Sequence, residues 1–257
     1  MRQDVVVQLE KFVAGRLAHW PPQWEGFHWP GYTYEHTLRV RNLALVLGDR
    51  EGAEREVVEL AAFLHDIAKP EGKNHARLGA EEAARVLRSL GCEPELVARA
   101  HYAIATHSGD NTLTHPVENR VLGDADLIDA NFGLVATWRF ITIRAGRQST
   151  IEDTIAGMAE WLPRKDELVS LLRTEAGLGV ARERSAAMHY FCAEVAEAFA
   201  GAGKGTPGLA QMVQYLAGNY ERAALVEQIP VIRQVAGAEP RVVAACDRLE
   251  AEIAGEV

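Results

Sequence analysis

The sequence has little of what marks a secreted or membrane-embedded protein. It contains only three cysteines among 257 residues, Cys92, Cys192 and Cys246, and none of them belongs to a CxxC pair. Disulfide bonds and a thiolate zinc site are therefore poor interpretations, and we expect a reducing, cytoplasmic location. No uninterrupted apolar run exceeds five residues, as at Leu60–Leu64, which is far too short to cross a bilayer, so no membrane partner is expected.

Basic side chains are also scarce relative to acidic ones. The chain has 27 lysines and arginines against 36 aspartates and glutamates, which gives a net charge of −9. Such a chain repels a phosphate backbone on average, so a long nucleic acid is not expected as a partner. A local cationic pocket for one small phosphate remains compatible with this balance.

The hydrophobic periodicity is helical throughout, without a convincing run of alternating β-branched residues, and this predicts an all-α fold. We expect one helical domain over residues 1–150 and a helical C-terminal extension over 151–257 that packs on the same core. The extension has no cluster of titratable residues, so we expect it to cover the site or to form a homo-oligomer contact. Helices are expected at 36–47, 57–68, 74–90, 94–107, 117–130, 133–145, 151–173, 180–200, 208–226 and 239–254.

The sharpest chemical signal is the doublet His65-Asp66 inside the almost wholly apolar segment 57–68. Burying an unpaired carboxylate is costly, so Asp66 requires a partner. A divalent cation bound beside the histidine is one solution. A buried hydrogen-bonded pair of the aspartate with histidine or arginine is the other, and the doublet alone leaves both open.

Three further histidines and one aspartate are candidate ligands, and each belongs to a different expected helix. His36 lies on an apolar stripe, His75 and His107 belong to mainly apolar helix faces, and Asp126 flanks the apolar side of its helix. Each of them alone is more often an ordinary core or surface residue. Five helices that each direct a nitrogen or oxygen ligand inward indicate a metal site, and the absence of sulfur suits Fe, Mn, Co, Ni, Zn or Mg.

The order of these segments resembles the HD-domain metal-dependent phosphohydrolase superfamily, an all-helical fold. The resemblance covers roughly residues 20–145 and rests first on YEHTLRVRNLA, AAFLHDIAKP and GDADLID. Two further segments, NHARLGAEEAARVL and IATHS, are similar to intermediate histidine motifs of subgroups that hold two metals. The expected architecture is thus an HD-domain helical bundle followed by a helical extension.

The resemblance also implies residue roles. One divalent ion would be held by four residues, namely His36, His65, Asp66 and Asp126. Asp66 would also bridge to a second ion, held by His75 and His107. Lys69 would face the negative charge of the substrate, although a helix-end surface lysine is the alternative. His101 competes with His107, which fits its motif better. A single ion, with His75 and His107 as hydrogen-bonding or substrate-contacting residues, also stays open.

The implied function is hydrolysis of a small phosphate ester or nucleotide by a metal-activated water, with Asp66 and Lys69 as catalytic residues. Two alternatives are a di-iron oxygenase of the same superfamily and a non-catalytic sensor that binds a nucleotide. A Gly-Ala-Gly-Lys-Gly-Thr segment at 201–206 resembles the end of a phosphate-binding loop. It has Ala198 where that pattern needs glycine, and no strand precedes it, so a helix–helix connection is the better interpretation.

Overall fold

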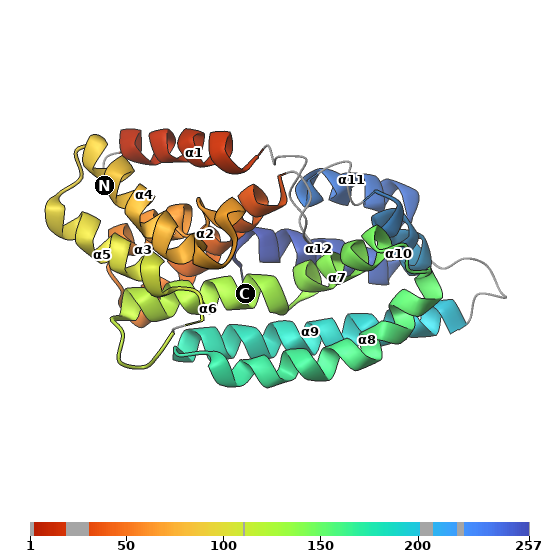
Figure 1. Cartoon of the computed structure of the whole chain (residues 1–257). Helices are drawn as coiled ribbons and strands as arrows, with labels where there is room; N and C mark the ends of the chain where they lie inside the picture. The colour runs from red at the N-terminus through yellow and green to blue at the C-terminus, as the bar shows by residue number, and fades with distance from the viewer. Residues whose placement is uncertain (1–2, 19–30, 110, 201–207, 220–223, 257) are drawn as a thin grey trace. The chain divides into compact units, whose positions relative to one another are not determined.

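The regular secondary structure in the described part of the chain is entirely helical. The computed structural model describes residues 3–18, 31–109, 111–200, 208–219 and 224–256, and no strand occurs among them (Figure 1). This confirms the predicted all-α class. None of the helices in these ranges is long and apolar enough to cross a membrane. His19, His28 and the segment 201–206 lie outside the described residues.

The helices pack as two compact units, each described by itself. The first unit contains Met1–Ile128 and Leu171–Gly179, and the second contains Asp129–Ser170 and Val180–Val257. The boundary between the two units, after Ile128, lies before the domain boundary that we expected at residue 150. The domain limits of 1–150 and 151–257 stay a prediction.

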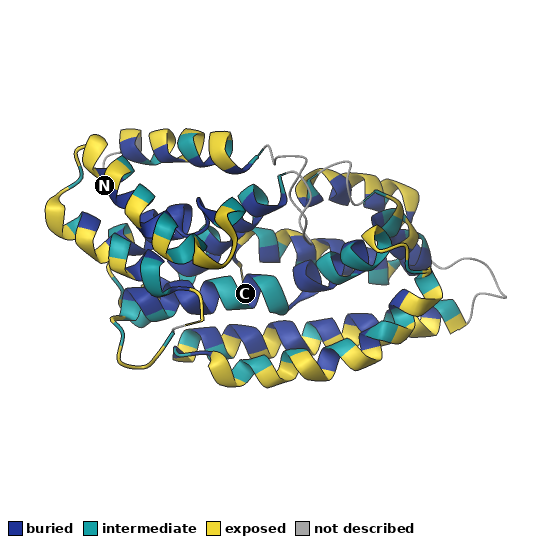
Figure 2. Ribbon diagram, in the orientation of Figure 1, coloured by how far each residue is buried: buried dark blue, intermediate teal, exposed yellow. Residues whose placement is uncertain are grey.

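The first unit is built around a helix that is buried over most of its length. Its elements are α1 (Gln3–Leu17), α2 (Tyr32–Glu51), α3 (Arg55–Leu64), the short 3₁₀ helix η1 (Lys69–Asn74), α4 (His75–Ser89), α5 (Pro94–Thr106) and most of α6 (Val117–Asn131). Helix α3 is buried at every position from Val57 to Leu64 and contacts α1, α2, α4 and α5 (Figure 2). A helix that is apolar all round must be surrounded in this way.

Helix α3 ends earlier than the apolar pattern of 57–68 suggests. It stops at Leu64, and residues 65–68 form a turn that leads into η1. Pro70 lacks a backbone N–H group, cannot continue an α-helix, and lies in the first turn of η1. His65 and Asp66 therefore lie at the end of a helix, where their side chains are not confined to its surface.

Helix α1 was missed by the sequence-based assignment. Its residues Val5, Leu9, Val13 and Leu17 are spaced four apart and are all buried, and α1 contacts α2 and α3. The valine run at 5–7 obscures this period, because only one of the three valines belongs to the buried stripe. At its end, Arg16 donates a hydrogen bond of 3.3 Å to the carbonyl oxygen of Ile67, beside the His-Asp doublet.

The second unit contains the remaining helices. They are α7 (Leu134–Gly146), α8 (Ile151–Asp166), most of α9 (Glu175–Ala200), α10 (Gly208–Asn219), α11 (Leu225–Val235) and α12 (Pro240–Ala254). The expected helix 151–173 is divided into α8 and the 3₁₀ helix η2 (Glu167–Leu171). The expected helix 208–226 ends at Asn219, and α11 was missed because Pro230 lies inside it.

A buried carboxylate on α6 holds Leu171–Gly179 within the first unit. Asp124 accepts hydrogen bonds from the backbone N–H groups of Arg173 and Thr174, at 3.0 and 2.8 Å, and from the Thr174 hydroxyl at 2.7 Å. It also accepts one from the Asn111 amide at 3.1 Å. These bonds attach the segment before α9 to α6. Asp124, which accepts them, lies two residues before the predicted ligand Asp126.

Replacing Asp124 with alanine should therefore destabilise the protein. The change leaves several buried N–H and O–H donors without an acceptor, which costs about 2–4 kcal/mol of the free energy of unfolding. Chemical denaturation measures this loss. Asp49→Ala is the matched control, because Asp49 forms only an exposed ion pair with Arg55, and it should cost no more than about 1 kcal/mol. Equal effects of the two changes would contradict the proposed role of Asp124.

Candidate metal centre

The structure brings all six predicted ligands together in the first unit. They come from separate elements: His36 from α2, His65 and Asp66 from the turn after α3, His75 from the start of α4, His107 from the end of α5 and Asp126 from α6. Their ligand atoms form three overlapping groups, each with all its atoms within 4.8 Å of one another. Asp66 is 1% exposed and lies at the centre of this cluster.

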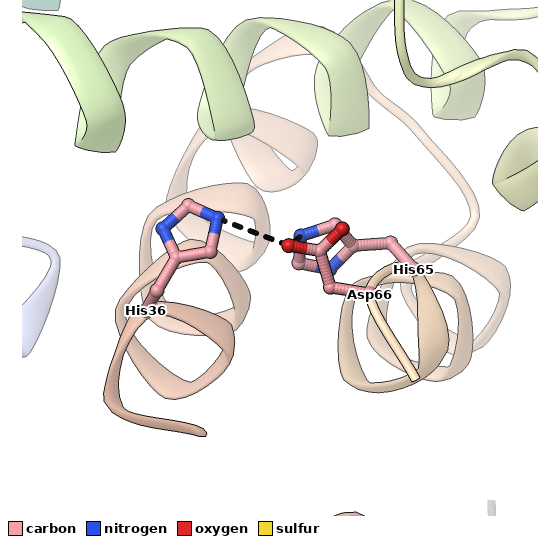
Figure 3. A group of neighbouring side chains, drawn as sticks. All are labelled: His36, His65 and Asp66. Carbon is pink, nitrogen blue, oxygen red and sulfur yellow. Dashed lines mark ion pairs between the residues drawn. The ribbon is translucent and has the colours of Figure 1, made fainter. Parts of the chain in front are cut away.

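The two oxygens of Asp66 face different pairs of histidines. Oδ2 lies 3.7 Å from Nε2 of His36 and 3.6 Å from Nε2 of His65 (Figure 3). Oδ1 lies 3.5 Å from Nε2 of His75 and 3.7 Å from Nε2 of His107. These separations are too long for good hydrogen bonds. The carboxylate thus has one imidazole pair on each side.

Three of the histidines are oriented by the same local contact. The Nδ1 atoms of His65, His75 and His107 lie 2.8, 2.9 and 2.6 Å from the backbone carbonyl oxygen three residues earlier. A carbonyl only accepts hydrogen bonds, so each Nδ1 carries the proton and each Nε2 presents a lone pair to the cluster. Metal-ligating histidines are fixed by this kind of contact to the second ring nitrogen.

The Nε2 atoms of these three histidines fit a cation. They are buried and have no hydrogen-bond partner. Burial lowers the pKa of His65 to about 4, so its imidazole is neutral at pH 7, and burial also lowers the pKa of His75. Buried, unpaired lone pairs next to a carboxylate are unfavourable unless a positive charge is shared among them. The nitrogen and oxygen donors suit divalent ions of the Fe, Mn, Co, Ni, Zn or Mg kind.

Asp126 completes the side of the cluster that contains His36. Its Oδ1 lies 3.0 Å from Nε2 of His36 and 4.0 Å from Nε2 of His65. Burial opposes ionisation of Asp126, but the contact with His36 outweighs it and lowers the pKa of the carboxyl group. Asp126 is therefore an anionic oxygen donor at neutral pH.

Lys69 lies against the central carboxylate. Its Nζ atom is 3.1 Å from Oδ1 and 3.0 Å from Oδ2 of Asp66, and its side chain is 26% exposed. Burial would raise the pKa of Asp66, but interactions with His65 and Lys69 hold it well below its ordinary value. Burial would likewise lower the pKa of Lys69, yet Asp66 and Asp126 raise it. Lys69 is thus a charged, site-facing residue, while its contact with substrate stays a prediction.

Tyr32 is a site residue that the sequence analysis did not single out. It is 2% exposed, its ring stacks parallel to that of His36 with centroids 6.2 Å apart, and it interacts electrostatically with Lys69. The signal was present in the sequence, since an aromatic residue four positions before His36 lies on the same helix face.

The other three histidines in the described part of the chain do not join the cluster. His101 is 36% exposed at its side chain and lies 3.7 Å from Glu81. His115 lies on an exposed segment with its Nδ1 atom 2.9 Å from the hydroxyl of Tyr102. His189, in the second unit, pairs with an exposed aspartate. The geometry therefore favours His107 over His101 as the inward-facing residue, as the motif spacing suggested.

Known proteins share this arrangement of helices. Residues 33–131 match the family model of the HD domain. YpgQ of Bacillus subtilis, an uncharacterized protein, is 25% identical over 159 residues, which cover 60% of this chain and 78% of YpgQ.

Two solved structures have the same fold. The crystal structure of YpgQ in complex with ADP has a TM-score of 0.57 at 23% identity, covering 76% of this chain and 94% of that one. An HD-superfamily hydrolase from Bacillus thuringiensis has a TM-score of 0.59 at 22% identity, covering 78% and 100%. The matched residues include all six members of the cluster, and this part of the chain, residues 33–131, is identified as an HD domain.

Proposed function

We propose that this protein is a metal-dependent phosphohydrolase that binds two divalent ions and cleaves a small phosphate ester or nucleotide. The observation that carries the proposal is the placement of Asp66, whose two oxygens each face a different pair of imidazoles. Asp66 would hold two divalent ions together with these imidazoles. His75 and His107 supply nitrogen donors on one side, and His36, His65 and Asp126 supply the other side.

The charge of this centre favours an anionic substrate. Its ligands include only two carboxylates, Asp66 and Asp126, which offset half of the charge of two divalent ions. Lys69 adds another positive charge at the same place. The centre therefore attracts a phosphate group even though the whole chain has a net charge of −9.

The residues around the centre have distinct roles in the proposed reaction. Divalent ions bound here supply a water whose pKa is lowered towards neutrality and positive charge beside the phosphoryl oxygens. Asp66 fixes the positions of the donors around it, and Lys69 binds an anionic oxygen of the substrate. The buried histidines and the ring of Tyr32 exclude bulk water, which strengthens these electrostatic interactions.

A nucleotide is a reasonable member of the substrate class. The fold relative YpgQ has been crystallised in complex with ADP, and the net negative charge of the present chain disfavours a longer nucleic acid. We further propose a reducing, cytoplasmic location, which agrees with the free thiols of Cys92, Cys192 and Cys246.

Hydrolysis of phosphate esters tests the proposal directly. The purified protein, supplied with each divalent metal in turn, should release phosphate or nucleoside from members of a panel of phosphomonoesters and nucleotides. Asp66→Ala should abolish this activity and sharply reduce the bound metal, because the change removes the carboxylate shared by both sides of the cluster. Asp49→Ala is the exposed control and should retain both.

Several outcomes would contradict the assignment. Full metal content and turnover in Asp66→Ala would make the doublet a structural pair. Consumption of oxygen by a coloured di-iron form, with no phosphate released, would indicate an oxygenase. Tight nucleotide binding without hydrolysis under every metal condition would indicate a sensor.

The number of ions is a separate prediction. Wild-type protein in metal-replete buffer should bind close to two equivalents, because each oxygen of Asp66 faces its own pair of donors. The double change His75→Ala with His107→Ala should leave about one equivalent, since it removes only the donors that face Oδ1. Elemental analysis after removal of free metal measures both values. Saturation of the wild type at one equivalent would make His75 and His107 hydrogen-bonding or substrate-contacting residues.

Lys69 should act on substrate more than on metal. Lys69→Ala should lower kcat/KM for an anionic substrate by roughly 10- to 1000-fold, or about 1.4–4 kcal/mol, because one charge-assisted contact to the transition state is lost. Metal content should stay near that of the wild type, since the change removes a cation from Asp66 and leaves every proposed ligand in place. Lys73→Ala, at an exposed position in η1, is the control. An unchanged rate in Lys69→Ala would leave the lysine only a structural pairing with Asp66.

A further inference from the structure

His36 lies one turn inside α2, whereas the other three histidines of the cluster lie at helix ends. Those three rings are oriented by the carbonyl oxygen three residues earlier. For His36 that carbonyl belongs to Thr33, and it already accepts a hydrogen bond of 2.8 Å from the Thr37 hydroxyl. In an α-helix the same carbonyl also accepts the backbone N–H four residues on, so both of its lone pairs are used. A different contact therefore orients His36.

The aromatic ring of Tyr32 supplies a contact of this kind. Tyr32 precedes His36 by four residues on α2, and the two rings are parallel to within 5°, with their centroids 6.2 Å apart. Residues four apart face the same side of a helix, and offset parallel rings at this separation attract each other. Tyr32 is 2% exposed, so the surrounding side chains confine its ring to this position.

Arg39 stabilises the position of the Tyr32 ring. Its guanidinium carbon lies over that ring, 5.8 Å from the centroid, a distance at which a cation is attracted to an aromatic face. Arg39 is itself 2% exposed, and its Nη1 atom lies 3.8 Å from a carboxylate oxygen of Glu35. Positions 32, 36 and 39 share one face of α2. The arginine, the tyrosine and the histidine thus form one buried set of side chains on this helix.

The contact between His36 and Asp126 does not replace the ring stack. Nε2 of His36 lies 3.0 Å from Oδ1 of Asp126, and this contact also orients the imidazole. Both atoms are proposed ligands of one ion, and a histidine that ligates a metal through Nε2 has no proton there to donate. The stack with Tyr32 uses neither ring nitrogen, so it orients His36 whether Nε2 binds a proton or a metal.

We propose that Tyr32 is a positioning residue of the metal centre, whose ring holds the imidazole of His36 in the orientation that binds the divalent ion on the Asp126 side. This inference rests on the proposed metal centre, and it concerns the binding of metal rather than the reaction. The ring, not the hydroxyl group, has this role, because the contact joins two ring faces. The affinity for the ion on the His36 side therefore depends on an aromatic residue at position 32.

Titration with metal alone tests this role. The double variant His75→Ala with His107→Ala keeps only the donors on the His36 side, and isothermal titration calorimetry with Mn²⁺, and in parallel with Zn²⁺, measures the affinity of the remaining ion. In this background Tyr32→Leu should weaken binding about 10- to 100-fold, the usual effect of removing a contact that orients a metal ligand. Tyr32→Phe keeps the ring and should bind metal as tightly as its parent.

Two controls separate positioning of His36 from a general loss of packing. Phe132→Leu, made in the same background, removes a fully buried aromatic ring of the second unit, so it should lower the unfolding temperature without weakening metal binding. In a chain that carries His36→Ala, adding Tyr32→Leu should cause no further loss of metal, because the imidazole through which Tyr32 acts is already absent. Thermal unfolding of each variant verifies that it folds.

Four results would overturn the proposal. They are unchanged metal affinity in Tyr32→Leu, an equal loss in Tyr32→Phe, an equal loss in Phe132→Leu, and a further loss when Tyr32→Leu is added to His36→Ala. Binding of neither metal by the parent double variant would show that the His36 side holds no ion, and would overturn the inference as well. Metal binding that depends on Tyr32, without hydrolysis of any ester, would contradict only the proposed reaction, so the two failures are distinguishable.

Discussion

The first unit depends on the burial of one carboxylate. Asp66 is 1% exposed, and an ionised side chain in that position is unfavourable unless positive charge and hydrogen-bond donors surround it. Lys69 provides one positive charge, at 3.0 Å. Four imidazole nitrogens approach the two carboxylate oxygens within 3.5–3.7 Å, and three of them present unshared lone pairs. Lone pairs do not stabilise an anion, so a group of this composition is favourable only when cations are shared between the imidazoles and the carboxylate.

Helix ends account for how the donors reach Asp66. His65, His75 and His107 each follow or begin a helix, and each ring donates from Nδ1 to the carbonyl three residues earlier. Because helix ends have free carbonyl groups, this contact requires no distant partner. The orientation of each imidazole is thus determined locally, and packing of the helices has only to bring the ends together.

Much of this could be predicted, and the failures have physical reasons. The periodicity of the sequence predicted the buried helix α3 and the helices that carry His36, His75, His107 and Asp126. It missed α11, because Pro230 argues against a helix interior although neighbouring helices stabilise it. The identity of the six cluster residues followed from the order of motifs. The resemblance also implied that Asp66 lies between two pairs of imidazoles. The distances between these atoms could not be predicted, because they depend on side-chain rotamers and on packing between α3, α4 and α5.

The kind of buried polar atom that lacks a partner at the His-Asp cluster predicts the charge of its ligand. In the first unit the buried atoms without partners include the Nε2 acceptors of His65, His75 and His107, which require a cation. A buried acceptor without a partner costs its desolvation free energy, so packing alone does not explain three such acceptors beside a carboxylate. This criterion therefore indicates a cation site in the first unit, where nitrogen acceptors surround a buried carboxylate.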